Sequence, residues 1–598
     1  MATFRKTFFL LAFCSIFGIA TAQPFTKITD TSNPVVAGAP LSQNGYQGAS
    51  WIDFNNDGLQ DLFVIRRALY QNLGNGQFLK VSPNGLSTGF GYGNTWADYD
   101  NDGDIDCFIS GGNQRGSSLF TNNGNGTFSK NMTAGIADSL ALRGWGSAFG
   151  DYDNDGFTDI VIAAPFGFAS ITDGNKLLHN NGNQTFTKID TSVVAIGTAP
   201  YTVPTWCDYD EDGDMDIFIG SGPANGTIEP DYLYHNQLKE SNVPSYFTKI
   251  TTAPIATDLA DGQVWNWIDY DNDKDLDAFV TNYTGTQNGM ENALYRKEAN
   301  GTFTRMTAAV VGSILSDKYL SLASIWEDFD NDGDLDCFVT NDGNVKNNYY
   351  QNNGDGTFSA ITSYALTSQA ASYAGATSAD YDNDGDIDLF VYGTNHSLFR
   401  NDLANGNHWV NLKLIGTQSN RSAIGSVAYL KATINGVSTW QTRQISAQNS
   451  FNGMSSLNAE YGLGDATIID SLVVKWASGH TDICTNIAAD KFYTLTEGQC
   501  PMMVSLENGY AAPHFQLQIA PNPSKQQTKF SYQLAKSSQV SLTIYDSSGK
   551  KVAQPLYEFQ TKGEHQFQWN HSELSAGLYF CILSAEGQQQ TQQLMILE

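Results

Sequence analysis

An aspartate-rich loop of fixed pattern recurs seven times in this chain. Each copy spans nine residues, with Asp at position 1, Asp or Asn at position 3, Asp at positions 5 and 9, and usually Gly at position 6. The copies, numbered loops one to seven, begin at Asp53, Asp98, Asp151, Asp208, Asp269, Asp328 and Asp380. Carboxylates this close together repel one another unless a hard cation lies among them, so the pattern predicts calcium binding.

The acidity of the chain is confined to these loops. The 598 residues carry a formal net charge of -30, but the loops hold 33 of the 62 acidic residues, and the rest of the chain sums to +2. This distribution indicates local metal binding and not an acidic disordered tail. Nucleic acid is excluded as an expected partner, because no basic patch remains and the loops would repel phosphate.

The N-terminus has the composition of a secretory signal. The basic pair Arg5 and Lys6 precedes an apolar run over 8–20, and small residues at 20–22 form a cleavage site. The run is shorter than the ~20 residues that a membrane-spanning helix needs. We therefore predict a signal peptide over 1–22 and no transmembrane segment.

The flanks of the loops separate the possible calcium folds. An EF-hand requires helices on both sides and a glutamate at position 12. Position 12 is instead β-branched in every copy: Val64, Ile109, Ile162, Ile219, Val280, Val339 and Val391. The copies are spaced 45, 53, 57, 61, 59 and 52 residues apart, which also excludes a nine-residue solenoid repeat.

Strands are expected on both sides of each loop. Positions 10 to 12 form short apolar runs typical of buried strands. Asn-Gly turns such as those within 119–128 and 349–358 indicate a further hairpin in each repeat. About fifty residues with several strands correspond to one propeller blade, so seven copies predict a seven-bladed β-propeller. The seventh repeat lacks its last strand, and we expect residues 25–28 to supply it.

This pattern resembles the FG-GAP or VCBS repeats of integrin-like propellers over residues 23–407. In that family the side chains at positions 1, 3, 5 and 9, with the carbonyl at position 7, hold calcium. The resemblance implies these metal ligands: Asp53, Asn55, Asp57 and Asp61; Asp98, Asp100, Asp102 and Asp106; Asp151, Asp153, Asp155 and Asp159; Asp208, Asp210, Asp212 and Asp216; Asp269, Asp271, Asp273 and Asp277; Asp328, Asp330, Asp332 and Asp336; Asp380, Asp382, Asp384 and Asp388.

Two loops depart from the pattern. Asn55 replaces a carboxylate at position 3 of loop one. Lys274 replaces glycine at position 6 of loop five, where a left-handed backbone is expected, and adds a positive charge. We expect up to seven calcium ions, with loops one and five binding most weakly.

Two further regions follow the repeats. Residues 408–498, with His408-Trp409-Val410-Asn411-Leu412 and Tyr461-Gly462-Leu463-Gly464, resemble the ASPIC/UnbV domain of bacterial cartilage-acidic-protein-like chains and are expected to form a small β-domain. Residues 499–515 are expected to be a linker. Residues 516–598 alternate short strands with turn signals, which predicts an immunoglobulin-like β-sandwich. They resemble the C-terminal sorting domain of the type IX secretion system, which implies export to the cell surface or beyond.

Cysteines and tryptophans give local expectations. Cys107, Cys207 and Cys337 are expected in the core, while Cys484 and Cys500 are candidates for a disulfide. Five tryptophans each stand two residues before a loop, at Trp51, Trp96, Trp206, Trp267 and Trp326. We expect them to be blade core, with ligand contact as the alternative.

Three functional classes fit these features. The first is a secreted or surface calcium-binding propeller that mediates adhesion or binds extracellular glycans or proteins. The second is an enzyme, a hydrolase or lyase, that acts on extracellular polysaccharide. The third is a structural component of the cell envelope. The sequence lacks H-E-x-x-H and G-x-S-x-G motifs, and nearly all clustered carboxylates belong to the loops, which favours binding over catalysis.

Overall fold

The computed structural model describes residues 24–37, 46–74, 76–86, 91–112, 116–132, 142–168, 171–222, 228–243, 245–283, 289–500, 517–534, 537–546, 550–585 and 588–597. The predicted signal peptide and nearly all of the predicted linker lie outside these residues. Within the described part of the chain, no helix is both long enough and apolar enough to cross a membrane.

The repeat region folds into sheets of antiparallel strands, with one acidic loop between the first two long strands of each sheet. The first four described sheets contain β2 (Ala49–Ile52), β3 (Asp61–Val64), β4 (Ala68–Asn72) and β5 (Phe78–Val81); β6 (Gly91–Ala97), β7 (Asp106–Gly111), β8 (Ser118–Asn122) and β9 (Phe128–Lys130); β10 (Ser147–Gly150), β11 (Asp159–Ile162), β12 (Lys176–Asn180) and β13 (Phe186–Lys188); and β14 (Tyr201–Cys207), β15 (Asp216–Ser221), β17 (Tyr232–Asn236) and β18 (Phe247–Ile250).

The next three sheets continue the series. They contain β20 (Gly262–Ile268), β21 (Asp277–Asn282), β23 (Ala293–Lys297) and β24 (Phe303–Arg305); β22 (Met290–Glu291), β25 (Lys318–Glu327), β26 (Asp336–Asp342), β28 (Asn348–Asn352) and β29 (Phe358–Ala360); and β31 (Tyr373–Ala379), β32 (Asp388–Gly393), β33 (Ser397–Asn401) and β1 (Phe25–Lys27). Short pairs join β16 (Glu229–Pro230) to β19 (Leu259–Ala260) and β27 (Val345–Lys346) to β30 (Ala370–Ala371). The described helices are single turns: α1 (Leu238–Ser241), α2 (Pro254–Thr257), α3 (Ala308–Val311), η3 (Ser313–Leu315) and η4 (Ala365–Thr367).

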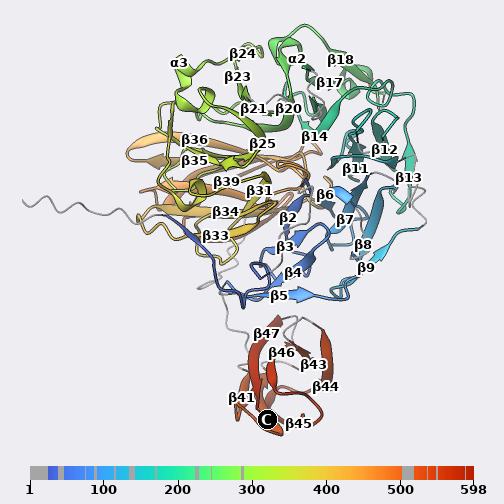
Figure 1. Cartoon of the computed structure of the whole chain (residues 1–598), viewed down its shortest axis with the longest axis vertical. Coiled ribbons are helices and arrows are strands. Elements are labelled where there is room, and N and C mark those ends of the chain that lie inside the picture. Colours follow the sequence, from blue (N-terminus) through green and yellow to red (C-terminus); the bar gives the residue numbers. More distant parts are fainter. Residues whose placement is uncertain are drawn as a thin grey trace, which may run out of the picture.

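The sheets form a closed ring around a centre lined by their first strands (Figure 1). The first strands of consecutive sheets contact one another, and β31 contacts β2. Trp51 and Tyr381 stack across this closure with ring centroids 5.8 Å apart. The expected N-terminal strand is confirmed, because Thr26 of β1 pairs with Arg400 of β33. Both chain ends of the repeat region therefore meet in one sheet.

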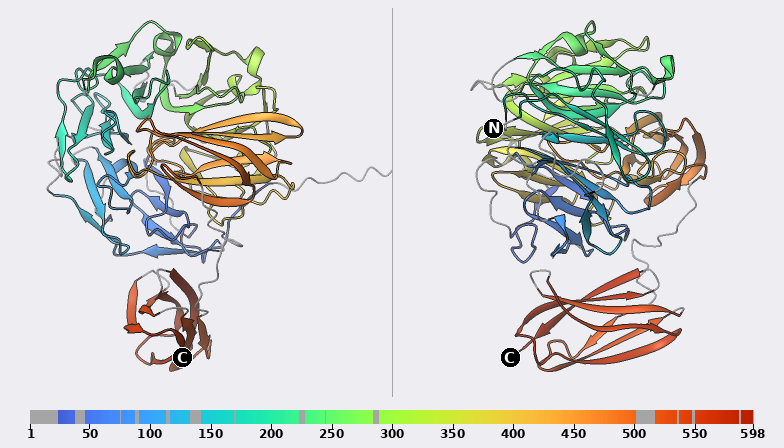
Figure 2. Two further views of the ribbon diagram at one scale, coloured as in Figure 1. Left: turned by 180° about the vertical axis from the view of Figure 1, so that it is seen from behind. Right: turned by 90° about the vertical axis from the view of Figure 1, so that its right-hand side faces the viewer.

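Residues 408–500 form two sheets that pack on one face of the ring, as Figure 2 shows for the orange strands. One sheet has the order β37 (Ala459–Gly464), β34 (His408–Ile415), β40 (Lys491–Thr496); the other has the order β36 (Val437–Gln444), β35 (Val427–Ile434), β38 (Ile468–Lys475), β39 (Thr481–Ala488). Their apolar core is continuous with that of the second sheet of the ring, since Trp96 and Tyr461 belong to one buried cluster. Cys484 and Cys500 form a disulfide.

The C-terminal residues form a separate two-sheet sandwich, drawn in red in Figure 1. One sheet contains β41 (Gln518–Ala520), β42 (Gln527–Leu534) and β45 (Gly563–Asn570); the other contains β44 (Lys551–Gln560), β43 (Ser538–Asp546), β46 (Gly577–Ala585) and β47 (Gln588–Ile596). Alternating residues of both sheets, such as Phe530 and Leu542, are fully buried between them. The predicted all-β class is confirmed for the described chain.

Candidate metal centres

Each acidic loop is a compact turn whose two end carboxylates are fixed by backbone donors. In loop two, Asp98 accepts the N–H groups of Asp102 and Gly103, at 3.1 and 2.7 Å. Asp106 accepts the N–H of Asn122, at the end of the third strand, at 2.7 Å. Equivalent bonds recur in the other loops, for example from Gly333 to Asp328 at 2.7 Å and from Asn352 to Asp336 at 2.8 Å. These bonds hold positions 1 and 9 on opposite sides of one small space.

The turn requires a left-handed backbone at two places. Position 6 has φ between +83° and +103°, and Lys274 adopts φ +85°, as its replacement of glycine predicted. Position 4, which the sequence analysis did not single out, is also left-handed, with asparagine in six loops and Glu211 in loop four. The ammonium of Lys274 lies 5.3 Å from the centre of the Trp440 ring. The ammonium group therefore lies over the Trp440 ring and does not enter the loop.

Position 3 presents an oxygen that no hydrogen bond satisfies. The buried Oδ1 atoms of Asp100, Asp153, Asp271, Asp330 and Asp382 have no hydrogen-bond partner. In loops two and six the other oxygen, Oδ2, is held by a side chain of a neighbouring segment: Gln184 lies 3.0 Å from Asp100 and Gln351 lies 2.9 Å from Asp330. Outer partners of this kind orient a metal ligand, so the arrangement fits a cation that takes Oδ1.

The carboxylates come close enough to share an ion. Ligand atoms of positions 1, 3 and 9 lie within 4.8 Å of one another in loops two, three and four, as in the set Asp98, Asp100 and Asp106. The pKa of Asp98 is raised to about 7, mainly by burial; the backbone hydrogen bond from Gly103 lowers it and the neighbouring aspartates raise it. A buried oxygen set with this charge suits calcium.

Two histidines join the carboxylates, and the sequence analysis missed both. His179 Nδ1 lies 3.3 Å from Asp153 Oδ2 and 3.2 Å from Asp159 Oδ1, and His235 occupies the matching place in loop four. Each directly precedes the asparagine that ends the third strand. The hydrogen bond that the His179 ring donates to Asp159 raises the pKa of His179 to about 9, against the effect of burial.

Position 4 links consecutive loops. Its asparagine amide donates to the carbonyl of the position 6 residue in the next loop, in the pairs Asn56 with Gly103, Asn101 with Gly156, Asn154 with Gly213, Asn272 with Gly333, and Asn331 with Gly385, at 2.8 to 3.2 Å. Loop four has Glu211 there, which instead pairs with Lys297 at 2.7 Å. Lys297 itself stands where the six other sheets have asparagine at the equivalent strand end, so these two departures from the pattern satisfy each other.

Residues 408–500 pack on the acidic loops. Direct contacts include Lys413 Nζ with Asp53 Oδ2 at 3.0 Å, Asp98 N–H with Ser422 Oγ at 2.9 Å, Lys475 with Glu211 at 3.7 Å, Thr442 Oγ1 with Asp269 Oδ2 at 2.7 Å, and Gly464 N–H with the Asn331 carbonyl at 2.8 Å. Gly156 of loop three faces Gln418, and Gly385 of loop seven faces Trp409. The loop face is thus largely an internal interface, which was not predicted from the sequence.

One segment of this region, residues Ile445–Leu457, enters the centre of the ring, and we name it the plug. The carbonyl of Asn452 accepts both the backbone and the side-chain N–H of Asn94 at 3.0 Å. Phe451 is 1% exposed, and its carbonyl accepts the hydroxyl of Tyr392 at 2.7 Å. Met454 forms a bridge with Ser50 of β2. Figure 2 shows orange loops reaching the middle of the ring.

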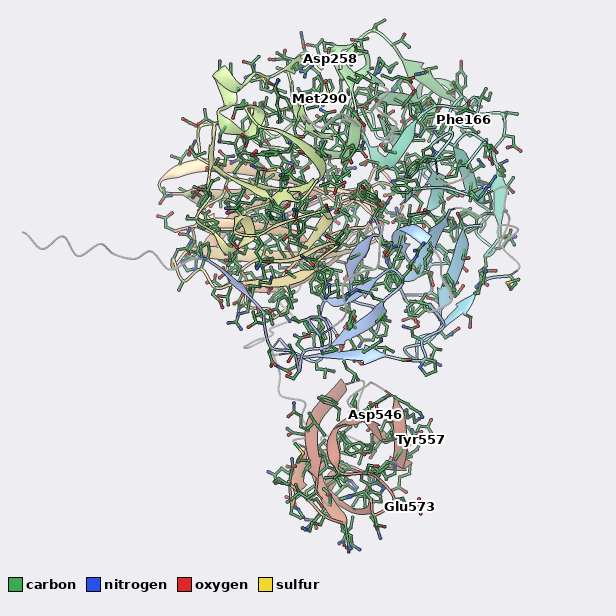
Figure 3. The ribbon with its side chains drawn as sticks, in the orientation of Figure 1. Phe166, Asp258, Met290, Asp546, Tyr557 and Glu573 are labelled. Carbon is green, nitrogen blue, oxygen red and sulfur yellow. A yellow bond between two sulfur atoms is a disulfide. The ribbon has the colours of Figure 1, made fainter. Side chains whose placement is uncertain are left out.

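The tryptophans before the loops are core residues, as expected. Their exposed fractions run from 0% at Trp51 and Trp96 to 9% at Trp267. Cys107, Cys207 and Cys337 are buried with free thiols, which confirms their expected place in the core. The dense side-chain packing of the ring is visible in Figure 3.

Comparison with known families agrees with this architecture. A family model described as FG-GAP-like repeat matches residues 53–109, 98–162, 166–219 and 328–391, and an FG-GAP repeat model matches 143–182. The ASPIC and UnbV model matches 416–501, and the secretion system C-terminal sorting domain model matches 518–597. The chain is therefore an FG-GAP repeat protein with an ASPIC and UnbV domain. Its last domain marks it for type IX secretion to the cell surface.

Similar solved structures share little sequence. An Agrocybe aegerita lectin that recognises non-reducing terminal N-acetylglucosamine is 17% identical, with 71% of this chain and 97% of that chain covered and a TM-score of 0.38. PorZ, a surface component of the type IX secretion system of Porphyromonas gingivalis, is 11% identical, with 92% and 81% covered and a TM-score of 0.18. No curated protein matches the chain.

Proposed function

We propose that this exported protein is a calcium-binding propeller that binds an extracellular glycan or protein at the cell surface. The observation that carries the proposal is the set of buried position 3 oxygens without hydrogen-bond partners. Leaving a buried carboxylate oxygen unpaired is costly, and calcium would remove that cost with the side chains at positions 1, 3, 5 and 9 as ligands. The ion supplies charge neutralisation and a rigid turn.

Calcium in these loops would also hold the ASPIC and UnbV domain in place, because that domain rests on the same turns. Thr442, for example, donates to Asp269 of loop five. Metal binding to a turn that is otherwise strained by charge repulsion is folding free energy. The ASPIC and UnbV domain, which we call the lid, covers one face of the ring. The outer rim and the opposite face of the ring are therefore left for partners.

The proposal is tested with the secreted protein in calcium and in chelator. Isothermal titration calorimetry should show several calcium ions bound per chain. Binding of the protein to glycans on an array, or to envelope proteins in a pull-down, should require calcium. Binding of partners without any calcium uptake would contradict the metal assignment. Calcium uptake without any partner would favour the structural envelope role.

One observation supports the enzyme alternative. A cleft of about 90 Å³ between the ring and the ASPIC and UnbV domain is lined by Glu327, Arg443 and Glu460 among others. Burial, and then the charge of Glu327, raise the pKa of Glu460 well above its usual range. Two carboxyl groups with one kept protonated resemble the pair that glycoside hydrolysis uses. Turnover of an extracellular polysaccharide that Glu327→Gln abolishes would establish this function.

A further inference from the structure

Loop one differs from the other six in how its oxygens are satisfied. Buried carboxylate oxygens without a hydrogen-bond partner occur in every other loop: Asp100 in loop two, Asp153 in three, Asp212 and Asp214 in four, Asp269, Asp271, Asp275 and Asp277 in five, Asp330 in six and Asp382 in seven. Among residues 53–61, all of which the structure describes, there is none. The loops therefore fall into a group of six and a single exception.

The side chains of loop one bond to one another. Asn55 Oδ1, which stands at position 3, accepts the N–H of Asp57 at 3.1 Å, and its amide donates to Asp57 Oδ2 at 2.9 Å. Asp57 Oδ1 accepts the N–H of Leu59 at 2.9 Å. The position that offers an open oxygen in five other loops is thus closed here by an amide that can donate.

A cation of the chain itself completes loop one. The ammonium of Lys413, on β34, lies 3.0 Å from Oδ2 of Asp53 at position 1. The side chain of Asp53 is 8% exposed, so this charge is met mainly by Lys413 and by the N–H groups of Asp57 and Gly58. At loop five the group of the same domain that hydrogen-bonds to position 1 is the neutral hydroxyl of Thr442.

Loop five shows that a lysine in the sequence is not enough. Lys274 belongs to loop five, but its ammonium lies over the ring of Trp440. Four oxygens of that loop remain without hydrogen-bond partners. A lysine can displace a metal only where its ammonium reaches a carboxylate of the loop, as that of Lys413 reaches Asp53.

We propose that Lys413 takes the place of the metal ion in loop one, so that the chain binds six calcium ions in loops two to seven. This inference rests on the proposed calcium binding of the acidic loops. Loop one then binds the ASPIC and UnbV domain to the ring through the ion pair of Lys413 with Asp53, without metal. Since Asp53 belongs to the first sheet of the ring and Lys413 to the first strand of the ASPIC and UnbV domain, this ion pair holds the domain on the ring even when calcium is scarce.

The test counts calcium ions per chain by elemental analysis of the full secreted protein after equilibrium dialysis. The wild type is expected to hold six. Lys413→Met should raise the count to seven, with the added ion bound more weakly than the rest. Asp57→Asn in loop one should leave the count at six, while Asp102→Asn at the same position of loop two should lower it to five. Lys475→Met, which removes another lysine that contacts the ring, is the matched control and should leave six.

Each other result overturns the inference. Seven ions in the wild type, or a count that falls with Asp57→Asn, would place metal in loop one. A count of six that Lys413→Met does not change would mean that the loop excludes metal without the lysine. No bound calcium at all would overturn the proposed function as well, which separates the two failures. Circular dichroism of each variant confirms that the β-fold is retained before ions are counted.

Discussion

Replacing Asp153 by asparagine should change the stability of the protein in opposite directions with and without calcium. Asp153 stands at position 3 of loop three, its side chain is 7% exposed and its Oδ1 has no hydrogen-bond partner. Burial raises its pKa from 3.8 to about 6, with Asp155 adding to the rise. At about 1.4 kcal/mol per pKa unit, the ionised side chain costs the calcium-free fold about 3 kcal/mol at pH 8.

The substitution removes that cost and little else. That cost already includes the contact of Asp153 with His179 at 3.3 Å, which lowers the pKa of Asp153. The buried amide that replaces the carboxylate has a smaller desolvation cost of its own, so the net gain for the calcium-free protein is about 2 kcal/mol. In calcium the sign reverses, because an amide is a poorer ligand. Losing an ion present at a thousandfold excess over its Kd costs about 4.1 kcal/mol, which exceeds the gain by about 2 kcal/mol.

Differential scanning calorimetry at pH 8 measures both effects. The melting temperature of Asp153→Asn should rise by a few degrees in chelator and fall by a few degrees in millimolar calcium, relative to the wild type. Asp190→Asn, at a position 69% exposed, is the control and should change neither value. Equal losses of stability in both conditions would refute the reasoning that buried charge, relieved by calcium, governs the loop.

Three further results are expected. First, the calcium-free protein should lose stability as pH rises from about 4 to about 7. Burial raises the folded-state pKa of Asp98, Asp208 and Asp269 to about 7, so the folded state binds more protons than the unfolded state in this range. Urea unfolding in chelator at pH 5 and pH 8 measures this, and a rise in stability with pH would contradict it. Second, chelation should speed hydrogen exchange in the plug, Ile445–Leu457, while the C-terminal sandwich is unaffected; an unchanged plug would show that calcium does not hold the lid. Third, Gly453→Ala should release the plug in calcium too, because a Cβ there would lie 2.0 Å from the carbonyl oxygen of Ala49; unchanged exchange in this variant would mean that the plug is not seated in the ring.

The parts of the fold that the sequence could predict are those that depend on residue patterns within one repeat. The loop positions, the strands on both sides of each loop and the left-handed Lys274 all follow from spacing within one repeat. The N-terminal strand β1 was predictable because its residues repeat a strand found in the other copies and absent from the last. Side-chain chemistry at fixed spacing fixes such features without knowledge of distant contacts.

Contacts between distant segments were not predictable. Lys413 and Asp53 are 360 residues apart, and nothing near either one indicates the other. The plug lies in a polar stretch of Gln, Asn and Ser that resembles an exposed loop, yet its backbone groups pair with the ring. Four other residues could have been noticed in the sequence, because each departs from the repeat consensus at one strand end or turn. They are His179, His235 and the ion-paired Glu211 and Lys297.

The most direct test of this account is an anomalous difference map from crystals of the protein grown in millimolar calcium, measured at a long wavelength. We expect peaks between the carboxylates of loops two to seven, each within reach of the position 3 Oδ1 atom, and the Lys413 ammonium at loop one. Loops without peaks, with ordered water between their aspartates, would contradict it.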